Sequence, residues 1–503
     1  MRKLKIKLLI IFSLLTNLIY SQEIIFPKPF GIAIDDFGWM QGSSLGDEGG
    51  PWRAGVRRYM DVRDYKPIVE IGKAIGVRFQ GVFVLSEMDR LNILTKYTTT
   101  TKQGEKWDNS ENINKKQIEI MDYVKENAAY LEFGLHGVGH EHFDHGKRTR
   151  AEWYDIENNK PWDEQDSKEH LKAFSEIMAQ YGLTKENGHS FPESYVPCAY
   201  AYYWNPNGEY STGKLMHEYG VKYVNTLFEE IPECNPPIEF GGGFDHGVLV
   251  INRYNYGNPW YEFASLPKDS LPNYKTEIIE THWPNWLAQD DFLQPELNKR
   301  WIEFFRRVQK SNTHFLAKNT EQLFSQWLYK KYTNVVIRKN AVTIDNTNMP
   351  NVAYQEGLLG NMVLKVKLEN NKHLSSANIN GKPISGYFEE CGYGFIYLPQ
   401  LKKEKYELSL EFGNKSLGTY INTTGTYNVY DVDLTNHKMS FDIKMYGHQE
   451  VKIICDKPKD ITCSNPYLKI KNWDYNQGNR TLSIELSGRD IQGEKGKISI
   501  NFE

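Results

Sequence analysis

The sequence predicts a deformed (β/α) barrel followed by an all-β sandwich region, and two patterns along the chain support this fold class. In the first two thirds, short apolar segments alternate with amphipathic helical segments, as in domains built on parallel sheets. From residue 333 onward the helical period is lost and apolar residues alternate with polar ones, which is typical of antiparallel sheets with one solvated face. We therefore expect a barrel over 22–332 and β-sandwich structure over 333–503.

The barrel prediction depends on an ordered series of strands and helices. Apolar runs predict strands at 31–34, 82–85, 131–135, 222–225 and 276–281. Apolar residues spaced by three and four positions predict helices at 65–75, 113–124, 167–180 and 295–311. Alternating units of this kind, spread over about 310 residues, suit a barrel or a deformed barrel.

The last third of the chain repeats a two-residue alternation. Apolar and polar residues alternate at 362–368, 406–412, 441–445 and 498–502, and Gly and Asn residues lie between these runs. We expect one or two β-sandwich modules here. These modules either pack against the barrel or bind carbohydrate, and the pattern leaves both roles open.

The N-terminus is typical of a secretory signal peptide. Cationic residues within 2–7 precede the apolar run 8–15, and Ser21 offers a small residue at a plausible cleavage point. We expect residues 1–21 to be removed and the protein to be secreted, into the periplasm or the extracellular space. Because no other run of about 20 apolar residues follows, we expect no stable insertion into a membrane.

Composition excludes several classes of protein. The chain has 25% charged, 40% hydrophobic and 14% aromatic residues, which indicates a globular protein and not a disordered one. A formal net charge of −4 argues against nucleic-acid binding. The five cysteines are too few for a disulfide-stapled scaffold, although Cys455 and Cys463 could close a short loop.

The histidines are strongly clustered, and the cluster predicts a metal site. His136, His140, His142 and His145 are four of the 13 histidines and lie in one short window. His136 and His140 follow a predicted strand and are four residues apart, so on a helical turn both imidazoles would face one ion. The alternative is a set of surface histidines around a glycine-rich turn.

Two further groups lie at the carboxyl ends of predicted strands, where barrels place their active sites. Asp35 and Asp36 end the first strand. Adjacent side chains diverge there, so one carboxylate can bind an ion while its neighbour acts as a base. His282 ends a late strand, and a histidine in this position can act as an acid or a base. A purely structural role is the alternative for each group.

The order of these motifs resembles the polysaccharide deacetylase family, whose fold is a deformed (β/α) barrel. The resemblance covers about residues 25–332 and implies that Asp35 is the general base and Asp36 a metal ligand. The segment from His136 through two glycines and a valine to His140 resembles the second motif of the family. It implies that both histidines complete a site for a divalent ion, with zinc as the expected metal.

The later motifs of the family are matched less closely. His282 resembles the general acid, and Asp245 resembles the residue that orients this acid. The place of the third motif is taken by residues 190–195, where Ser190 stands instead of the arginine that holds the base. The expected support of the base carboxylate is therefore in doubt.

Three residues are assigned to substrate binding. Tyr195 lies in the third-motif segment, Trp283 follows the predicted acid, and Arg53 lies in an insertion over 38–58 that we cannot place in the family. Half of the 12 tryptophans flank the candidate motifs. Aromatic faces stack on sugar rings, although tryptophans are more often simply buried. We therefore expect a polysaccharide or oligosaccharide substrate.

Two reactions fit these parts. In deacetylase-like hydrolysis the metal polarises an acetyl carbonyl, Asp35 takes a proton from water and His282 protonates the leaving group. In elimination the metal binds a uronate carboxylate, a base such as His142 or His246 removes the C5 proton, and His282 or Tyr195 protonates the departing oxygen. The second reaction forms an unsaturated uronic acid at an oligosaccharide end. The order of the motifs favours hydrolysis, whereas the missing arginine keeps elimination open. The third hypothesis is a non-catalytic carbohydrate-binding protein.

Overall fold

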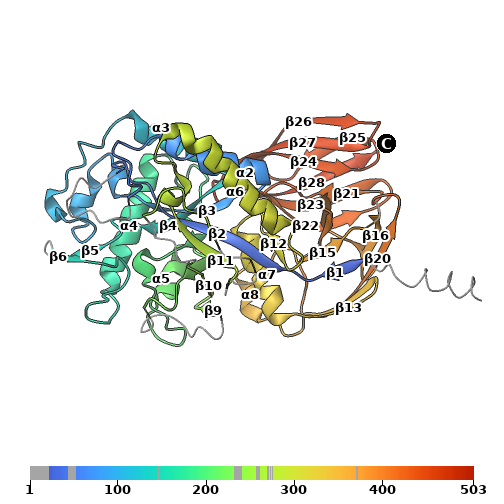
Figure 1. Ribbon diagram of the computed structural model, residues 1–503, viewed down its shortest axis with the longest axis horizontal. Helices are drawn as coiled ribbons and strands as arrows, with labels where there is room; N and C mark the ends of the chain where they lie inside the picture. The colour runs from blue at the N-terminus through green and yellow to red at the C-terminus, as the bar shows by residue number, and fades with distance from the viewer. Residues whose placement is uncertain are drawn as a thin grey trace, which may run out of the picture.

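The computed structural model describes residues 22–42, 53–144, 147–231, 241–255, 261–268, 271, 274, 276–369 and 372–503. An α/β part and an all-β part lie side by side (Figure 1). The predicted signal peptide lies outside the described residues. Within these ranges, no helix has both the length and the apolar character needed to cross a membrane.

The α/β part is built on one curled sheet with the strand order β11-β2-β3-β4-β7-β8-β10-β9. All neighbours are parallel except β9, which is antiparallel to β10, and β12 adds to β2 in parallel. The strands are β2 (Lys28–Phe37), β3 (Phe79–Val84), β4 (Leu131–Gly137), β7 (Ser194–Tyr195), β8 (Tyr223–Thr226), β9 (Gly242–Asp245), β10 (Val248–Asn252), β11 (Ile278–His282) and β12 (His314–Leu316).

The sheet closes on itself just after β10. The backbone N–H of Tyr254 donates to the carbonyl of Ile278 at 2.8 Å, and the carbonyl of Tyr254 accepts from the N–H of Glu280 at 3.0 Å. This bridge joins β10 to β11, which already pairs with β2. The predicted deformed (β/α) barrel is confirmed, and its closure brings residues after β10 next to the ends of β2 and β11.

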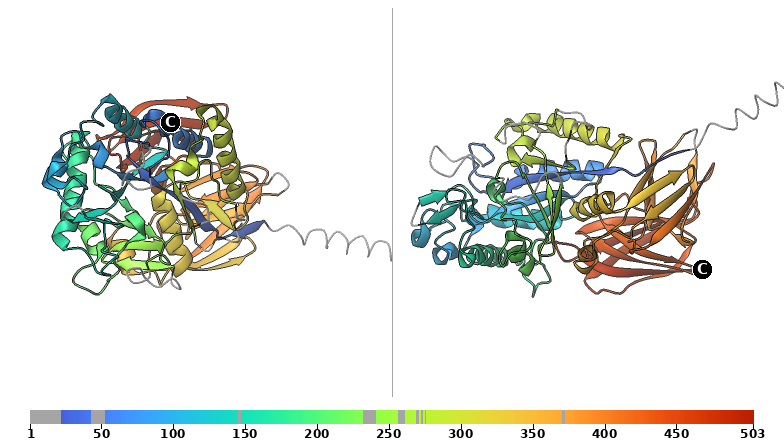
Figure 2. Two further views of the ribbon diagram at one scale, coloured as in Figure 1. Left: turned by 60° about the vertical axis from the view of Figure 1, so that its left-hand side comes forward. Right: turned by 90° about the horizontal axis from the view of Figure 1, so that it is seen from below.

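Helices cover the outside of the barrel (Figure 2). They are α2 (Lys66–Ile75), α3 (Lys115–Glu126), α4 (Glu164–Gln180), α5 (Thr212–Glu218), α6 (Gln294–Gln309) and α7 (Thr320–Tyr332). The first of these shows why the sequence forms helices here: Pro67 starts α2, the buried Ile68 and Ile71 share one face, and Gly76 ends it at φ 66°. The predicted helices at 65–75, 113–124, 167–180 and 295–311 are therefore confirmed.

Short elements complete the barrel loops. A hairpin is formed by β5 (His142–Asp144) and β6 (Lys147–Thr149). Single turns of 3₁₀ helix occur at η1 (Val62–Asp64), η2 (Ser86–Met88), η3 (Ile93–Lys96), η4 (Gly104–Lys106), η5 (Cys198–Tyr200), η8 (Trp283–Trp286) and η9 (Asp291–Leu293). Most of these follow barrel strands and therefore lie on the face where side chains of the candidate site converge.

The all-β part contains two sandwich modules that share one sheet. The shared eight-stranded sheet has the order β1-β15-β19-β18-β21-β24-β27-β26; a five-stranded sheet (β13-β14-β20-β16-β17) and a four-stranded sheet (β22-β23-β28-β25) complete the two modules. Two separate hydrophobic cores result, and the first continues under the barrel through α7. The prediction of β-sandwich structure after residue 332 is confirmed.

The strands of the shared sheet are β1 (Glu23–Ile25), β15 (Val363–Lys367), β18 (Gly386–Glu390), β19 (Tyr393–Tyr397), β21 (Tyr420–Asn422), β24 (His448–Ile454), β26 (Leu468–Asn476) and β27 (Thr481–Gly488). The facing sheets contain β13 (Asn334–Arg338), β14 (Ala341–Asp345), β16 (His373–Ile379), β17 (Lys382–Pro383), β20 (Lys405–Gly413), β22 (Asn428–Leu434), β23 (Lys438–Met445), β25 (Pro458–Cys463) and β28 (Glu494–Phe502). A short helix, α8 (Asn351–Gln355), precedes β15.

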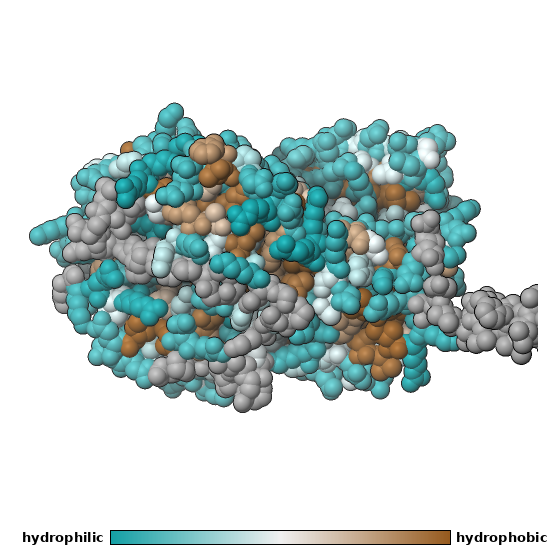
Figure 3. All heavy atoms as spheres, in the orientation of Figure 1, coloured by the Kyte–Doolittle hydropathy of each residue, from teal (hydrophilic) through white to brown (hydrophobic). Residues whose placement is uncertain are grey.

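The surface of the all-β part is mostly hydrophilic, with one hydrophobic area near the edge strand β13 (Figure 3). Val336 and Ile337 of this strand are among the exposed aliphatic side chains. Cys455 and Cys463 are both free thiols. The disulfide that these two residues could have formed is therefore absent, because β25 pairs with β28 and holds Cys463 in a different sheet from β24, which ends just before Cys455.

The boundary expected at residue 332 coincides with the end of α7, yet the two parts are not separate in packing. Strand β1, inside the range expected for the barrel, pairs with β15 of the all-β part. The side chain of Gln492 donates to the carbonyl of Phe133 at 2.8 Å, and Arg78 donates to the carbonyl of Ile491 at 3.1 Å. The loop before β28 is thus inserted into the end of the barrel opposite to the candidate site.

A buried ion cluster also joins the two parts. Lys444 of β23 lies 2.5 Å from a carboxylate oxygen of Glu193 and 3.1 Å from one of Glu321. Burial by itself would raise the pKa of Glu193, but the charges of Lys444 and Lys222 lower it to about 2. Since the ordinary pKa of a glutamate is 4.5, this carboxylate contributes stability that is present above about pH 4.5 and is lost as the pH falls towards 2.

Replacing Lys444 with methionine is expected to reduce the free energy of unfolding by about 3 kcal/mol, because the change leaves two carboxylates facing each other in the interface. Urea unfolding at neutral pH measures this loss. Lys452→Met is the matched control, since Lys452 forms an exposed pair with Glu450 and its loss is expected to cost below about 1 kcal/mol. Equal losses in the two variants would contradict a stabilising role for the buried cluster.

Candidate metal centre and acid–base site

The candidate residues converge at the carboxyl ends of the barrel strands. A small cavity of about 90 Å³ is lined by Asp35, Asp36, His136, His140, Arg150, Pro197, Ala199, Tyr200, Arg253 and His282. These residues come from β2, from β4 and its following loop, and from segments after β7 and β10 and at the end of β11. Active sites of barrel enzymes occupy this position.

Asp36, His136 and His140 form the tightest part of this group. One carboxylate oxygen of Asp36 lies 3.2 Å from Nε2 of His136 and 3.5 Å from Nε2 of His140. Ligands bound tetrahedrally at about 2.0–2.1 Å from one ion are separated by about 3.3 Å. Both oxygens of Asp36 are buried and accept no hydrogen bond of normal geometry from the described residues. The three side chains therefore fit a shared divalent ion.

A bulge in β2 aims both aspartates at the site. The pairing of β2 with β3 shifts register between Ile34 and Phe37, and Asp36 adopts φ 75°. In a regular strand, adjacent side chains point to opposite faces. The bulge and the left-handed backbone re-aim one of them, so Asp35 and Asp36 line the same cavity. Strain of this kind is often found at functional sites.

His136 is held in the tautomer that a metal ligand needs. Its Nδ1 lies 2.7 Å from the carbonyl of Val196, so the proton on Nδ1 is donated there and Nε2 keeps its lone pair towards Asp36. Its own backbone carbonyl accepts from Nε1 of Trp153 at 2.8 Å. Burial lowers the pKa of His136, but the neighbouring carboxylates of Asp36 and Asp35 prevail and raise it. A cation at this position is electrostatically favoured.

His140 is not on a helical turn, and this part of the sequence prediction is wrong. The segment after β4 is an irregular loop, and His140 adopts φ 65°. A buried chain of hydrogen bonds fixes the loop: Glu152 accepts from the N–H of Val138 at 2.8 Å and lies 2.8 Å from Nδ1 of His170. Burial lowers the pKa of His140 to about 3, so it is neutral and able to bind a metal.

Cys198 is a further candidate ligand that the sequence prediction missed. Ligand atoms of His136, His140 and Cys198 all lie within 4.8 Å of one another. The Cys198 thiol is fully buried and donates to the carbonyl of His136 at 3.3 Å. Burial, together with nearby carboxylates, raises its pKa well above the ordinary value. Asp36 and Cys198 are thus two candidates for the third ligand beside the two histidines. The shorter contacts of Asp36 with these histidines favour Asp36.

The base carboxylate has an arginine partner, and this residue was also missed. Arg253 follows β10 and donates to the two oxygens of Asp35 at 3.0 and 2.7 Å. Its Nε lies 3.4 Å from Glu280, which accepts from the hydroxyl of Tyr200 at 2.8 Å. Burial would raise the pKa of Asp35, but Arg253, with His136 and His282, lowers it to about 2. Asp35 is therefore ionised at neutral pH.

The position of Arg253 in the sequence could have indicated that it is a site residue. Asn252 is the last residue of the otherwise apolar strand β10, and Arg253 follows it directly. In a closed barrel, residues at such a position face the strands on either side. The segment at Ser190 instead lies near the all-β part, where Ser190 Oγ donates to Asp490 at 2.7 Å.

His282 faces the two aspartates across the cavity. Its Nε2 lies 3.9 Å from one oxygen of Asp35 and 3.9 Å from one oxygen of Asp36. Its Nδ1 lies 3.8 Å from Glu280. The ring is 12% exposed, so it can contact a substrate. This position suits an acid that delivers a proton to a leaving group near the ion.

Asp245 does not orient His282, which corrects that prediction. Its carboxylate accepts from the hydroxyl of Tyr202 at 2.8 Å and from the N–H of Gly213 at 3.3 Å, and it does not line the central cavity. The reason lies in the topology, because Asp245 ends β9, the strand antiparallel to β10 at the far edge of the sheet order. The carboxylate beside Nδ1 of His282 belongs to Glu280.

The three residues assigned to substrate binding do not line the central cavity. Tyr195 is fully buried and packs edge-on against Trp153. Trp283 is also fully buried, and its Nε1 donates to the carbonyl of Asp64 at 3.0 Å. Both are core residues, and their assignment to substrate is wrong. Arg53 lines a second cavity and pairs with Glu87 at 2.5 Å.

The additional histidines lie outside the central cavity as well. His142 stacks on Trp162 with ring centroids 3.7 Å apart and lies 3.3 Å from Asp166. Nε2 of His246 lies 3.2 Å from the carbonyl of Asn205. His145 lies outside the described residues. Neither His142 nor His246 is placed to remove a proton from a substrate bound next to Asp35 and Asp36.

Comparisons with known proteins leave the function open. No protein-family model matches the chain, and no curated protein matches it. Among solved structures, a GH57-type branching enzyme of Pyrococcus horikoshii is similar, with 11% identity, a TM-score of 0.32, and coverage of 58% of this chain and 69% of that chain. A GH57 branching enzyme of Thermococcus kodakaraensis, in complex with glucose, has 11% identity, a TM-score of 0.26, and coverage of 60% and 77%. At this level of similarity, the function has to be argued from the site.

Proposed function

We propose that this protein is a secreted, metal-dependent carbohydrate hydrolase that removes acetyl groups from a polysaccharide or its oligosaccharides. Asp36, His136 and His140 hold a divalent ion, with zinc as the first choice because two imidazoles and one carboxylate are typical zinc ligands. Such an ion, when bound, polarises a carbonyl oxygen and lowers the pKa of a water molecule. The substrate is carbohydrate because the site resembles that of polysaccharide deacetylases in its order of motifs.

The side chains then divide the proton transfers. Asp35 accepts a proton from the attacking water, whose oxygen forms a bond to the acetyl carbon. The bond from that carbon to the sugar nitrogen or oxygen breaks, and His282 gives its proton to the departing atom. The products are acetate and the free amine or hydroxyl. Arg253 keeps Asp35 ionised and fixes its orientation through two parallel hydrogen bonds.

The contact between Arg253 and Asp35 is the observation that best supports this proposal. Elimination remained open in the sequence because the arginine that holds the base was missing from its motif. An arginine from another strand fills that role, next to the proposed metal ligands. The histidines suggested as bases for elimination, His142 and His246, lie outside the cavity. These two observations support hydrolysis, and they count against elimination with His142 or His246 as its base.

Product analysis tests the proposal. The purified protein, loaded with zinc, is incubated with acetylated chitooligosaccharides, with acetylated xylan and with uronate oligosaccharides. We expect acetate from at least one acetylated substrate and no rise of near-ultraviolet absorbance from the uronates. Absorbance without acetate would identify an unsaturated uronate product and overturn hydrolysis in favour of elimination. Binding of a carbohydrate without formation of either product would support the hypothesis of a non-catalytic carbohydrate-binding protein. Asp35→Asn protein serves as the control for background hydrolysis.

A further inference from the structure

A second cavity of about 340 Å³ lies beside the candidate metal centre. Its lining includes Trp39, three residues after Asp36, and Gly139 and Glu141, which flank His140. The two cavities thus share the loops that carry two of the proposed metal ligands. The volume lies in the range of small-ligand sites, about 300–1,000 Å³.

The lining of the second cavity contains several buried polar atoms that make no hydrogen bond to the described residues. They are Nε1 of Trp39, Nε of Arg53, Oγ1 of Thr101 and Oδ1 of Asn112. Buried polar groups are nearly always paired in native proteins, so such a cluster needs an explanation. Trp39, Thr101 and Asn112 are each at most 5% exposed. A ligand that fills the cavity can satisfy them.

The chemistry of these atoms indicates what the ligand offers. Two are obligate donors, the Trp39 and Arg53 N–H groups; the Asn112 oxygen is an acceptor; and the Thr101 hydroxyl is both. A carboxylate ligand would need donors only. Hydroxyl groups both donate and accept, so a polyhydroxylated, neutral ligand matches the mixture.

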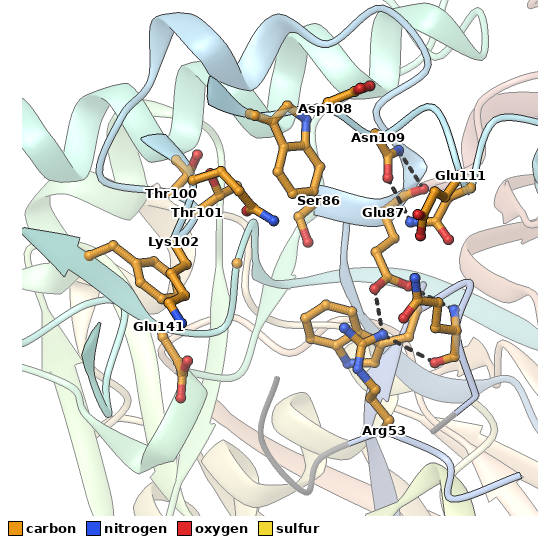
Figure 4. A pocket seen from close by; sticks show the side chains of 17 residues that line it. Arg53, Ser86, Glu87, Thr100, Thr101, Lys102, Asp108, Asn109, Glu111 and Glu141 are labelled. Atoms are coloured by element: carbon orange, nitrogen blue, oxygen red, sulfur yellow. Dashed lines mark hydrogen bonds and ion pairs between the residues drawn. The ribbon is translucent and has the colours of Figure 1, made fainter. Parts of the chain in front are cut away.

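The fixed charges of the cavity support the same conclusion. The guanidinium of Arg53 lies 2.5 Å from Glu87 and packs over the ring of Trp39, so its charge is already balanced (Figure 4). Glu87 itself accepts from the N–H groups of Met40 and Gln41 at 2.7 and 2.8 Å. Lys102 lies on the other side of the cavity, near Glu141 (Figure 4). Of the described cations that line this cavity, Arg53 is therefore paired with Glu87, and Lys102 lies near a carboxyl group.

An aromatic surface is also present. Trp107 is partly exposed in the cavity, and its Nε1 donates to Asp89 at 3.1 Å, which fixes the ring. An aromatic ring that is held in place, next to both hydrogen-bond donors and acceptors, is the usual arrangement for stacking a sugar ring.

We infer that this second cavity is a recognition site for a neutral sugar unit, N-acetylated or unsubstituted, adjacent to the unit that reaches the metal centre. The inference deepens the proposed function, because it names the substrate class that the same enzyme selects. Two of the residues that line it, Trp39 and Arg53, belong to the insertion over 38–58 that has no counterpart in the motif order. Uronate oligosaccharides are disfavoured here.

Binding calorimetry with Asp35→Asn protein tests the inference without turnover. The ligands are chitobiose, xylobiose and digalacturonate. We expect the neutral disaccharides to bind more tightly than digalacturonate. Trp39→Phe and Thr101→Val each remove one unpaired polar atom with little change of shape and are expected to weaken neutral-sugar binding about fivefold, as for about 1 kcal/mol. Trp107→Ala is expected to weaken it about tenfold.

Matched variants outside the cavity separate this effect from general damage. Trp473→Phe changes an exposed tryptophan of β26, and Thr343→Val changes a half-buried threonine of β14; both are expected to bind as the parent protein does. Urea unfolding checks that the cavity variants are folded. Unchanged affinity in all three folded cavity variants, or tighter binding of digalacturonate, would overturn the inference. If neutral-sugar binding weakens in the cavity variants, the inference is supported even when the enzyme releases no acetate. Failure of the proposed hydrolysis and failure of the sugar-recognition site can therefore be told apart.

Discussion

Replacing His136 with alanine is expected to lower the affinity for a divalent ion more than about a hundredfold and to reduce turnover to near background. Substitution of residues that only support metal ligands typically costs 10–100-fold in affinity, so loss of a direct ligand should exceed this range. His136 is also fixed in its ligand tautomer by the carbonyl of Val196. Metal content after dialysis, followed by zinc titration, measures the effect.

The same measurement separates the two candidate third ligands. If Asp36 binds the ion, Asp36→Asn loses metal as His136→Ala does, whereas Cys198→Ala keeps it. The opposite result would assign Cys198 to the metal. His373→Ala is the matched control, because His373 pairs with Glu389 at 2.9 Å in the all-β part. Full metal occupancy in His136→Ala would refute the proposed centre. Zinc should also raise the unfolding temperature of the parent protein and not that of His136→Ala.

Much of the fold could be predicted because hydrophobic periodicity is local information. The helical face of 66–75 and the strand 131–137 are visible in runs of ten residues or fewer, and both were found where expected. The switch to two-residue alternation likewise marks the end of α7 at Tyr332. Pairing across the chain is not local, however. The pairing of β1 with β15 joins segments more than 300 residues apart and has no signature in either segment.

The candidate site shows the same limit. Asp36, His136 and His140 were predicted because they lie at strand ends within short motifs. In the structure, Nε2 of each histidine lies within 3.5 Å of one carboxylate oxygen of Asp36. Tyr195 and Trp283 were placed wrongly because aromatic residues near a motif are indistinguishable, in sequence, from aromatic core residues. Arg253 was missed because its partner Asp35 is 218 residues away, and only barrel closure brings the two together.

Replacing Arg253 with methionine is expected to reduce turnover by about 10²–10⁴-fold, the range for losing a general base, while metal binding is kept. Asp35 would then be buried without its cation, and burial alone raises the pKa of this carboxyl. The base would be partly protonated and free to rotate away from the water. Asp35→Asn, which removes the base directly, is expected to lose activity to a similar extent, and the double variant should be little worse than either single one, because both act on one step.

Arg253→Lys distinguishes a positioning role from simple stability. Lysine keeps a positive charge but cannot make two parallel hydrogen bonds to one carboxylate, so partial activity is expected, above that of methionine and well below the parent. Since Arg253 is fully buried between Asp35 and Glu280, the variants are first checked for folding and zinc content. Arg480→Met, which breaks an exposed pair with Asp456, is the control and should retain parent activity. A folded, zinc-loaded Arg253→Met protein with unchanged turnover would exclude Arg253 as the residue that holds the base. With Arg253 excluded, elimination would become as well supported as hydrolysis.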